Sequence, residues 1–529
     1  MTLPRLRRLS QTLFLGLFLV LLWKTELRGS FQPGAVEFRL PPAVRAFLET
    51  DPLVAITNAL ATRALYHGLI WSLAILIPTL FLGRFFCGWI CPLGTLNHLV
   101  SDIRSERKSG RQRIASNRYQ PWQRFKYYLL FALLAAAFLG GALVGILDPI
   151  ALTVRSFALS ILPAGNYALN ALSGHGHTLL PAAFLSFKQA HFRQGFLLGV
   201  IFIAILALNL RITRFWCRAV CPLGALLGLF SRWSILGLVK QPAHCEDCNR
   251  CLLHCQGGDD PIPGARWRKA ECHLCMNCVA DCPESGIQFR FFPPAAGSGT
   301  IEGADLRRRK VLTGLAAGAV AIPLLRANTG LSAEPHERLI RPPGALDEKL
   351  FLARCVRCGE CMKVCLKSAL YPAAWQAGIE GIYTPLVVPR LGYCEYNCTL
   401  CGQVCPTGAI PRLPVDTKQR EVIGKAVLDK NHCLPFAKKI DCIVCEEHCP
   451  IPTKAIRSRE VETLGLDGRL KKVKEPYVVE EICNGCGICE NVCPLETKAG
   501  IEVFAVKDRT PIAEGPVGET QDGSGLGYQ

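Results

Sequence analysis

Six groups of four closely spaced cysteines constrain the fold of this chain more than any other feature. They contain all but four of the 28 cysteines in the 529-residue sequence. The groups are Cys245, Cys248, Cys251 and Cys255; Cys272, Cys275, Cys278 and Cys282; Cys355, Cys358, Cys361 and Cys365; Cys394, Cys398, Cys401 and Cys405; Cys433, Cys442, Cys445 and Cys449; and Cys483, Cys486, Cys489 and Cys493. Most follow the spacing C-x2-C-x2-C-x3-C, but the fourth has one extra residue in its first gap and the fifth has a long first gap.

This spacing suits a [4Fe–4S] cluster, which needs four thiolates around one compact core. Three cysteines two residues apart let one loop supply three ligands, and the fourth cysteine of the run ligates the other cluster of a two-cluster module. We therefore expect six [4Fe–4S] clusters in three modules. The expected ligand sets are Cys245, Cys248 and Cys251 with Cys282; Cys272, Cys275 and Cys278 with Cys255; Cys355, Cys358 and Cys361 with Cys405; Cys394, Cys398 and Cys401 with Cys365; Cys433, Cys442 and Cys445 with Cys493; and Cys483, Cys486 and Cys489 with Cys449.

Structural zinc and disulfides are the alternatives to these clusters. Zinc sites favour two C-x2-C pairs separated by a spacer, rather than a triple followed by C-x3-C. Disulfide scaffolds are typically short, secreted chains with a higher density of cysteine. The recurrence of the pattern favours iron–sulfur clusters over both.

The remaining four cysteines lie in two copies of one motif. The sequence RFFCGWICPLGTL begins at Arg84 and RFWCRAVCPLGAL begins at Arg214, and each follows an apolar run. The cysteines of the motif are Cys87, Cys91, Cys217 and Cys221. The i, i+4 spacing places two thiols on one face of a helix, although the proline after the second cysteine indicates that a helix begins or breaks there.

Three roles for these four cysteines stay open from the sequence. They could form a reversible redox pair in each half, they could jointly ligate one further metal centre, or they could pack at a tight turn. The repetition of the motif favours a redox or ligand role. The repeat also indicates two similar halves that meet at a pseudo-symmetric interface.

Five uncharged apolar segments indicate membrane spans. They cover residues 9–23, 64–83, 127–147, 194–210 and 311–325. The second and third are long enough to cross a hydrocarbon core of about 30 Å. A buried core helix is the alternative for each segment, and a cleaved signal peptide is a further alternative for the first.

The positive charge of the chain supports the same interpretation. A net charge of +18 is compatible with nucleic-acid binding, but the basic residues cluster beside the apolar segments. The loop from residue 101 to 126 has eight basic and two acidic residues. Because basic loops stay in the cytoplasm, we expect the N-terminus, this loop and both copies of the cysteine motif on the cytoplasmic side, and no nucleic-acid partner.

A second signal lies near residue 305. The sequence DLRRRKVLTGLAAGAVAIPLLRA starts at Asp305 and places Arg308 and Arg309 before a mild apolar run. This pattern is similar to an internal twin-arginine export signal, and a basic flank on an ordinary span is the alternative. Under either interpretation, we expect the residues after this segment to lie on the outer side of the membrane.

His67 is the candidate quinol-binding residue. It lies in the second apolar segment, and ionisable residues inside a membrane usually have a function. Imidazole also titrates near neutral pH, so it can accept a proton from quinol. A hydrogen-bonded or surface histidine is the alternative.

The sequence resembles two known families joined in one chain. Residues 1–290 resemble the NapH/MauN family, with apolar spans, two C-x-x-x-C-P motifs and a cytoplasmic two-cluster ferredoxin. Residues 305–507, with the twin-arginine leader and RPPGALDEKLFLARCVRCGECMKVC, resemble the NapG/MauM polyferredoxins. The stretch CEYNCTLCGQVCP departs from the usual spacing of that family. The resemblance implies electron transfer from membrane quinol toward a periplasmic redox enzyme or cytochrome, or assistance in maturing such an enzyme.

The expected fold is a membrane α-helical bundle of about four spans plus one linking span, with three small α+β two-cluster modules of the bacterial ferredoxin type. The expected domains are a membrane domain at 1–235, a cytoplasmic ferredoxin module at 236–292, a signal or anchor at 305–328, a periplasmic four-cluster domain at 334–507 and a flexible tail at 508–529.

We predict an electron-transfer component that draws on the quinone pool, rather than a stand-alone enzyme, although quinol oxidation is within its scope. A maturation or redox-repair factor for a periplasmic metalloenzyme is the second hypothesis. A cluster-rich structural or interaction module is the third.

Overall fold

A computed structural model describes most of the chain. The described residues are 3–25, 45–64, 66–105, 109–173, 190–192, 194–241, 245, 248–263, 265–284, 286–293, 300–301, 303–304, 306–327, 336–464, 470–506, 509 and 511–512. They form two compact units, which are described separately. The first unit consists of Met1–Pro335, Ala345–Leu386 and Thr399–Arg412, and the second of His336–Gly344, Val387–Cys398 and Leu413–Gln529. The stretch 334–507, expected as one domain, therefore contributes to both units.

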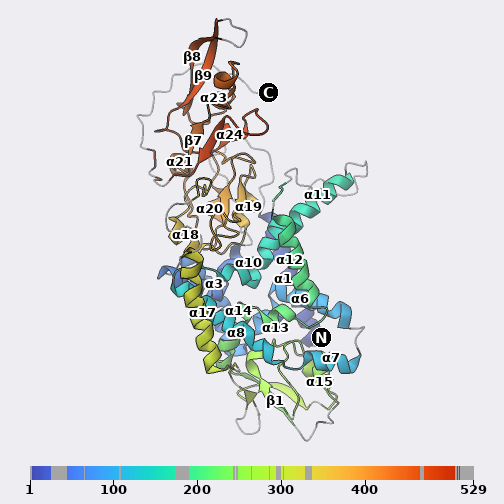
Figure 1. The fold of residues 1–529 in the computed structure, drawn as a ribbon. Coiled ribbons are helices and arrows are strands. Elements are labelled where there is room, and N and C mark those ends of the chain that lie inside the picture. Colours follow the sequence, from blue (N-terminus) through green and yellow to red (C-terminus); the bar gives the residue numbers. More distant parts are fainter. Residues whose placement is uncertain are drawn as a thin grey trace. The chain divides into compact units, whose positions relative to one another are not determined.

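The first unit is built mainly of helices (Figure 1). Its α-helices up to the first ferredoxin module are α1 (Leu3–Lys24), α2 (Arg45–Glu49), α3 (Pro52–Thr62), α4 (Leu73–Leu82), α5 (Phe85–Trp89), α6 (Pro92–Ser105), α7 (Gly110–Asn117), α8 (Phe125–Phe138), α9 (Val144–Leu147), α10 (Pro149–Ser156), α11 (Leu162–Ser173), α12 (Gly195–Leu208), α13 (Phe215–Ala219) and α14 (Pro222–Phe230). Short irregular helices are η1 (His67–Ser72), η2 (Pro121–Arg124), η3 (Phe157–Ile161) and η5 (Ser231–Trp233). A last long helix, α17 (Arg308–Ala327), follows the module.

Each of the five apolar segments contains a helix. Among the described residues, α1 is the one helix that is long and apolar enough to cross a membrane, and it lies near the N-terminus. The apolar helices Pro52–Thr62, His67–Leu82 and Gly195–Leu208 are shorter, and α8 has 14 residues. By length and composition alone, a bundle of four spans is not established.

Two glycines let α17 approach α8 closely. A Cβ atom at Gly314 would lie 2.8 Å from the carbonyl oxygen of Tyr128, and one at Gly318 would clash with the carbonyl oxygen of Ala132. From the first contact pair to the second, the position advances by four residues along each helix, so the two helices run in the same direction. Small residues at four-residue spacing are typical of helix pairs in membranes.

The described strands form five two-stranded sheets. The strands are β1 (Leu236–Lys240), β2 (Trp267–Arg268), β3 (Ile287–Phe291), β4 (Thr300–Ile301), β5 (Leu370–Pro372), β6 (Pro385–Val387), β7 (Lys425–Leu428), β8 (Ile456–Leu464), β9 (Leu470–Val478) and β10 (Ile501–Phe504). The pairs are β1 with β3, β2 with β4, β5 with β6, β7 with β10 and β8 with β9. The pairs β1–β3 and β7–β10 are antiparallel and join distant ends of a module, from Leu236 to Phe291 and from Lys425 to Phe504.

The first ferredoxin module, residues 236–292, packs at the N-terminal end of α8. Besides β1 and β3 it contains α15 (Arg250–Leu253), the short helix η7 (Lys269–Glu271) and α16 (Asn277–Ala280). Its core groups Trp267, Leu238 and Ile287 with Cys251, Cys272 and Cys278. The side chain of Glu271 meets Lys126, near the beginning of α8, in an ion pair. Because both charged groups are buried, each needs the other as its counter-charge.

A second cysteine-bearing region of the first unit packs at the other end of α8. It contains α18 (Glu348–Arg354), α19 (Glu360–Val364) and α20 (Leu400–Val404). The guanidinium of Arg357 donates to the carbonyl oxygen of Ala142, which follows α8, and to that of Glu380 at 2.6 Å. Arg155 donates to the carbonyl oxygen of Arg357 at 3.1 Å. The helix α8 therefore reaches from one cysteine-bearing region to the other.

The second unit holds the last two cysteine groups. Its helices are α21 (Val415–Arg420), α22 (Leu434–Ala437), α23 (Val444–Glu447) and α24 (Ile488–Asn491). The long hairpin of β8 and β9 pairs Ile456 with Val478 and continues to Leu464 and Leu470. The buried core of the unit includes Val503, Ile501 and Ala426 from the β7–β10 pair.

Candidate metal centres

The first expected ligand set lines one cavity. Cys245, Cys248, Cys251 and Cys282 all face it, and its other walls include Ile262 and Ile287. Cys245 and Cys248 precede α15, Cys251 lies within it, and Cys282 follows α16. The chain thus brings the four residues to one apolar place, as a cluster-binding loop requires.

The second expected set surrounds a buried position beside α8. The thiols of Cys272 and Cys278 are electrostatic neighbours of Cys275, and so is the thiol of Cys255 from the preceding group. Burial, then the nearby Asp259, raises the pKa of the Cys255 and Cys272 thiols. The Cys255 thiol donates to Asp259 at 2.7 Å. All four residues are buried, and a bound metal would replace the proton on each of their thiols.

The third set meets in the first unit. The thiols of Cys355, Cys358 and Cys405 are all electrostatic neighbours of Cys361. Burial and then these thiols raise the pKa of Cys361. The fourth set, which includes Cys365, is distributed over both units, because Cys394 and Cys398 belong to the second and Cys401 to the first.

The last two sets lie in the second unit. Burial, followed by the thiols of Cys442 and Cys493, raises the pKa of Cys433 to about 11. Burial also raises the pKa of Cys486 to about 12, with smaller contributions from Cys483 and from Cys449 of the preceding group. In both cases a thiol from one group stands beside the first three thiols of the other, which is the exchange expected of two-cluster modules.

The final cysteine of each C-terminal group accepts a backbone hydrogen bond. The donors are the N–H groups of Ala369 to Cys365 at 3.2 Å, Ile410 to Cys405 at 3.4 Å, Ala455 to Cys449 at 3.3 Å and Gly500 to Cys493 at 3.3 Å. Hydrogen bonds to cluster sulfurs adjust the reduction potential. Within the described ranges, no three His, Cys, Asp or Glu side chains are grouped as around a single metal ion.

The two C-x-x-x-C-P motifs fold alike. Cys87 lies in α5 and Cys217 in α13, whereas Cys91 and Cys221 directly precede the prolines that begin α6 and α14. The helix breaks between the two cysteines of each motif, as the prolines indicated. The Sγ of Cys91 accepts from the N–H of Gly94 at 3.4 Å, and the Sγ of Cys221 accepts from that of Gly224 at 3.2 Å.

The four thiols form one group rather than two pairs. We call Cys87, Cys91, Cys217 and Cys221 the thiol tetrad; all four are buried. The thiols of Cys217 and Cys87 act electrostatically on Cys91, and those two together with Cys91 act on Cys221. Cys87 also acts on Cys217. Every pair within the tetrad is therefore in electrostatic contact, including all pairs across the two halves.

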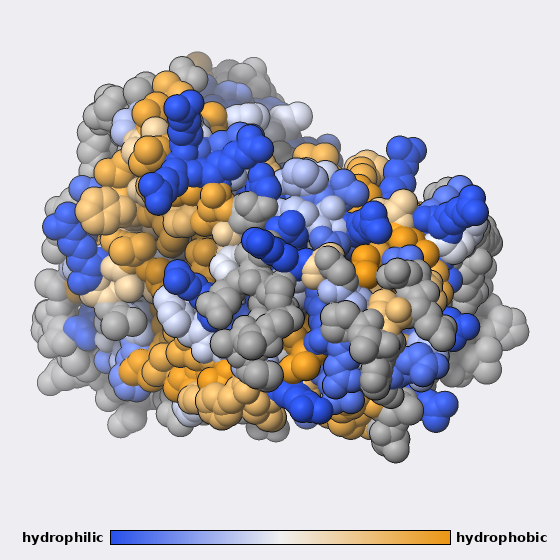
Figure 2. Space-filling model, turned by 90° about the horizontal axis from the view of Figure 1, so that it is seen from below, coloured by the Kyte–Doolittle hydropathy of each residue, from blue (hydrophilic) through white to orange (hydrophobic). Residues whose placement is uncertain are grey.

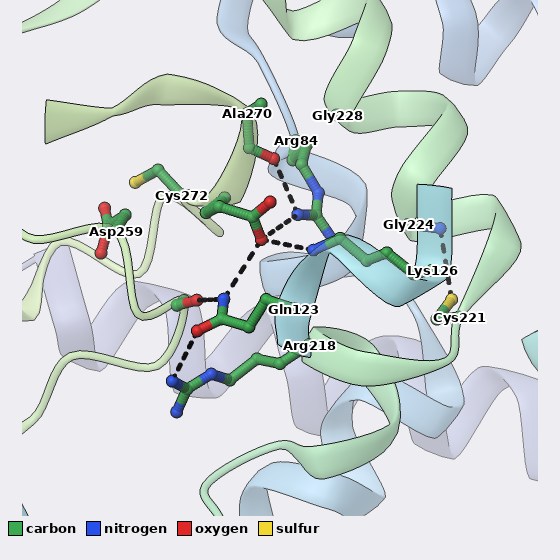
Figure 3. A network of polar contacts seen from close by, with 12 residues as sticks. Arg84, Gln123, Lys126, Arg218, Cys221, Gly224, Gly228, Asp259, Ala270 and Cys272 are labelled. Atoms are coloured by element: carbon green, nitrogen blue, oxygen red, sulfur yellow. Dashed lines mark hydrogen bonds and ion pairs between the residues drawn. The ribbon is translucent and has the colours of Figure 1, made fainter. Parts of the chain in front are cut away.

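A buried charge network joins the segment that begins α8 and the two repeated motifs to the first ferredoxin module (Figure 3). The carboxylate of Glu271, next to Cys272, binds Lys126 and lies 3.8 Å from Arg84. It also accepts from Gln123 at 3.3 Å, and Gln123 in turn accepts from Arg218 at 2.8 Å. Burial alone would raise the pKa of Glu271, but the charges of Lys126 and Arg84 hold it below its ordinary value.

The sequence alone did not identify several of these residues. Arg84 and Arg214 open the repeated motif, so the repetition itself was the available signal. Nothing in the sequence marked Glu271. Asp51 and Asp148 both precede Pro at a helix start, and they lie side by side and fully buried. His67 is exposed at the beginning of η1, and no described contact joins it to a cysteine group.

The repeated motifs match a known family model. A model described as a 4Fe–4S binding domain matches residues 64–111 and 194–237. Those two segments contain the thiol tetrad and none of the six quartets.

Named relatives resemble parts of the chain. The methylamine utilization ferredoxin-type protein MauM of Paracoccus denitrificans is 38% identical over 160 residues, which cover 30% of this chain and 68% of the relative. The ferredoxin-type protein NapG of Escherichia coli is 36% identical over 211 residues, 39% of this chain and 84% of the relative. The putative electron transport protein YccM of Escherichia coli is 27% identical over 271 residues, 50% of this chain and 66% of the relative. No solved structure matches the chain.

Proposed function

The chain belongs to the family of ferredoxin-type proteins that includes MauM and NapG, and on that premise we propose that it carries electrons through the cytoplasmic membrane, between quinol and a redox enzyme or cytochrome on the periplasmic side. The relatives and the 4Fe–4S family model establish an iron–sulfur electron-transfer role. The membrane location, the donor and the acceptor are the proposed part.

One observation carries the proposal: α8 connects two cysteine-bearing regions at its opposite ends. Lys126 at its beginning pairs with Glu271 beside Cys272, and Ala142 after its end accepts from Arg357, which neighbours Cys358. The 14 residues of α8 span about 21 Å at 1.5 Å per residue, and Ala142 lies four residues beyond the end of the helix. The helix alone therefore covers about two thirds of a hydrocarbon core of about 30 Å. Clusters held by the two regions would stand on opposite sides of a membrane that surrounds α8.

Apolar side chains on the outside of the first unit support a lipid environment. On α1, α4, α12 and α17 the residues Leu13, Phe81, Phe196 and Leu312 are all at least half exposed. Figure 2 shows broad hydrophobic areas on the face that it displays, separated by groups of hydrophilic residues. Monomeric soluble proteins rarely expose contiguous apolar areas of this kind. We therefore propose that α4, α8, α12 and α1 form a four-span, NapH/MauN-type part and that α17 is the linking span.

The direction of α17 supports the same topology. It runs in the same direction as α8, as the Gly314–Tyr128 and Gly318–Ala132 contacts require. Both helices begin next to basic residues, among them Arg124 and Lys126 for α8 and Arg308 and Arg309 for α17. Because basic flanks stay in the cytoplasm, both would cross outward, and the residues after α17 would be periplasmic.

The clusters in this proposal are held by the six expected ligand sets, which supply a chain of one-electron centres. When bound, each cluster accepts and releases one electron without forming or breaking a covalent bond to substrate. The protein residues hold the thiolates, exclude water and donate N–H groups to sulfur. Quinol would release its protons to water or to a nearby side chain, for which His67 is the proposed candidate.

Quinol-driven reduction of the purified full chain tests the proposal. Anaerobic protein in lipid nanodiscs is mixed with a reduced quinol analogue, and cluster bleaching is followed in the visible range. We expect rapid, repeated turnover when a soluble periplasmic acceptor such as a cytochrome is added. A chain that serves only in the maturation of a partner would hold reducible clusters but would not sustain such turnover. Stoichiometric zinc in place of about four irons per quartet would refute the cluster assignment itself.

A further inference from the structure

We propose that the thiol tetrad, Cys87, Cys91, Cys217 and Cys221, jointly holds a seventh metal centre, an iron–sulfur cluster shared by the two halves of the first unit, which relays electrons between the cluster sets of Cys272 and Cys358. The relay role rests on the proposed function, whereas the existence of the centre does not.

The four thiols are arranged for one shared centre and not for two separate pairs. Asn97, from the first half, donates to the Sγ of Cys217 in the second half at 3.5 Å. Arg214, from the second half, donates to the carbonyl oxygen of Cys87 in the first at 2.9 Å. Each thiol that interacts with its partner in the same motif also interacts with a thiol of the other motif.

Backbone donors also converge on the tetrad. The N–H groups of Gly94 and Gly224 each donate to a tetrad sulfur. At both positions a Cβ atom would crowd a neighbour, since it would lie 2.6 Å from the carbonyl oxygen of Cys87, in the same motif, at Gly94 and 2.7 Å from Arg84, in the other motif, at Gly224. The glycine of each C-P-L-G motif thus allows close approach, and N–H donation to sulfur stabilises anionic thiolates.

Buried positive charge beside the tetrad exceeds the buried negative charge that faces it. Arg84 and Arg214 are at most 1% exposed. The Nε and Nη2 atoms of both guanidinium groups have no hydrogen-bond partner among the described residues. Glu271 is the shared counter-charge of Lys126 and Arg84, so Lys126, Arg84 and Arg214 together exceed it by two positive charges near four protonated thiols. Unpaired buried charges are strongly unfavourable, and this arrangement indicates that the tetrad carries negative charge in the native protein.

An iron–sulfur cluster supplies the missing charge. An oxidised cluster held by four thiolates has a net charge of about −2 whether it contains two or four irons. That charge balances the excess. A disulfide in each motif would leave the tetrad neutral and the excess positive charge uncompensated. A single divalent ion is also disfavoured, because the described thiols are not grouped as around one ion.

The position of the tetrad fits a relay. On one side, the indole of Trp89 donates to the carbonyl oxygen of Leu274 at 3.0 Å, between Cys272 and Cys275. On the other side, Asp148 is an electrostatic neighbour of Cys91 and of Arg155. Arg155 is in turn an electrostatic neighbour of Cys358. With clusters bound, a reduced cluster on one side would give one electron to the tetrad centre, where one ferric iron would become ferrous; the tetrad centre would be reoxidised as that electron passes to the oxidised cluster on the other side.

The test uses the full chain, purified without oxygen in nanodiscs, with the double variant Cys91→Ser/Cys221→Ser. Serine is a good residue at the start of a helix, so α6 and α14 should form. We expect the variant to lose about two or about four irons per chain and the same amount of acid-labile sulfide. We also expect it to lose one signal in the electron paramagnetic resonance spectrum of the reduced protein. Thr95→Ala, which removes a buried side chain of the same turn but no ligand, should retain the full iron content.

A second measurement does not depend on the folding of the variant. Total iron in the wild-type chain should exceed the 24 atoms of six cubes by about two or about four. Arg214→Gln should lower the reduction potential of one centre, because the more negative reduced cluster loses a nearby positive charge.

The outcomes separate the inference from the proposed function. Iron content unchanged by the double variant, or a disulfide detected by alkylation and mass spectrometry in the wild-type tetrad, would overturn the inference. If the wild-type protein holds the extra iron but quinol never reduces any cluster, the proposed function fails and the centre stands. If the centre is present, the double variant should block quinol-driven reduction of the Cys358 set, while dithionite still reduces it; unimpaired quinol-driven reduction would overturn the relay.

Discussion

Replacing Glu271 by glutamine should loosen the first ferredoxin module from the helices. Glu271 is 4% exposed and binds Lys126, Tyr127 and Gln123 of the segment that begins α8. Lys126 is fully buried, so the variant leaves an ammonium group without its counter-charge. Removing one partner of a buried pair costs about 3–5 kcal/mol. Since about 1.4 kcal/mol corresponds to a factor of ten, the population in which the module has separated should rise at least about a hundredfold.

Limited proteolysis of the full chain in nanodiscs measures this separation. When opening and closing are fast, the cleavage rate follows the population of the open form, so cleavage within residues 236–292 should accelerate at least about a hundredfold. Glu284→Gln, which changes an exposed carboxylate of the same module, should leave the rate unchanged. The double variant Glu271→Gln/Lys126→Met should recover much of the loss, because it removes the unpaired charge. A Glu271→Gln rate within about threefold of wild type, or additive effects in the double variant, would refute the assignment of this pair as the main docking interaction.

Three further predictions concern the same first unit. The docking of the module should be insensitive to pH between about 7 and 4.5 and should weaken only as the pH falls further. The Glu271 carboxyl has a lowered pKa in the folded chain, so it stabilises the fold above its unfolded pKa and loses that contribution as it becomes protonated. Proteolysis that accelerates already between about pH 7 and 5 would contradict this. Gly318→Val should destabilise the contact of α17 with α8 by about 1–3 kcal/mol and lower the melting temperature. Ala319→Val, on the exposed side of α17, should leave the melting temperature unchanged. Equal melting temperatures for the two variants would show that the close approach of the helices is dispensable. Arg308→Lys/Arg309→Lys should keep a reporter fused after residue 507 inside the cytoplasm if the twin-arginine system exports this part, and normal export would leave α17 as an ordinary span.

The iron–sulfur character of the protein was predictable because a cluster ligand loop is a local structure. Three cysteines separated by two residues reach one core with little help from the rest of the fold, so spacing alone indicates the chemistry. The named relatives confirm the polyferredoxin resemblance. The exchange of the fourth cysteine between neighbouring groups is a prediction of the same kind, since both groups lie close together along the chain. The membrane arrangement remains a proposal, because α1 alone among the described helices has the length and composition of a span.

The grouping of the tetrad was not predictable in the same way. The sequence showed two equivalent motifs, each with its own pair of thiols, and left a pair in each half and a shared centre equally open. Only the packing of α5 and α6 against α13 and α14 brings Cys91 next to Cys217 and Cys221 next to Cys87. The positive charge at Arg84 and Arg214 indicates a nearby anion only because both residues are buried. The same residues on a surface would be solvated by water.

The sequence by itself determined the iron–sulfur character of the protein and predicts which cysteines act as ligands, because ligand spacing depends on a few bonds of separation along the chain. The tertiary structure decided which ligand groups stand next to one another and which charges face them. Arg214 contacts Cys87 across more than a hundred residues of intervening chain, and Glu271 pairs with Lys126 at a similar separation in the sequence. Contacts of that range arise from the packing of apolar helix faces, which many sequence patterns satisfy equally well, and so they cannot be obtained from residue spacing.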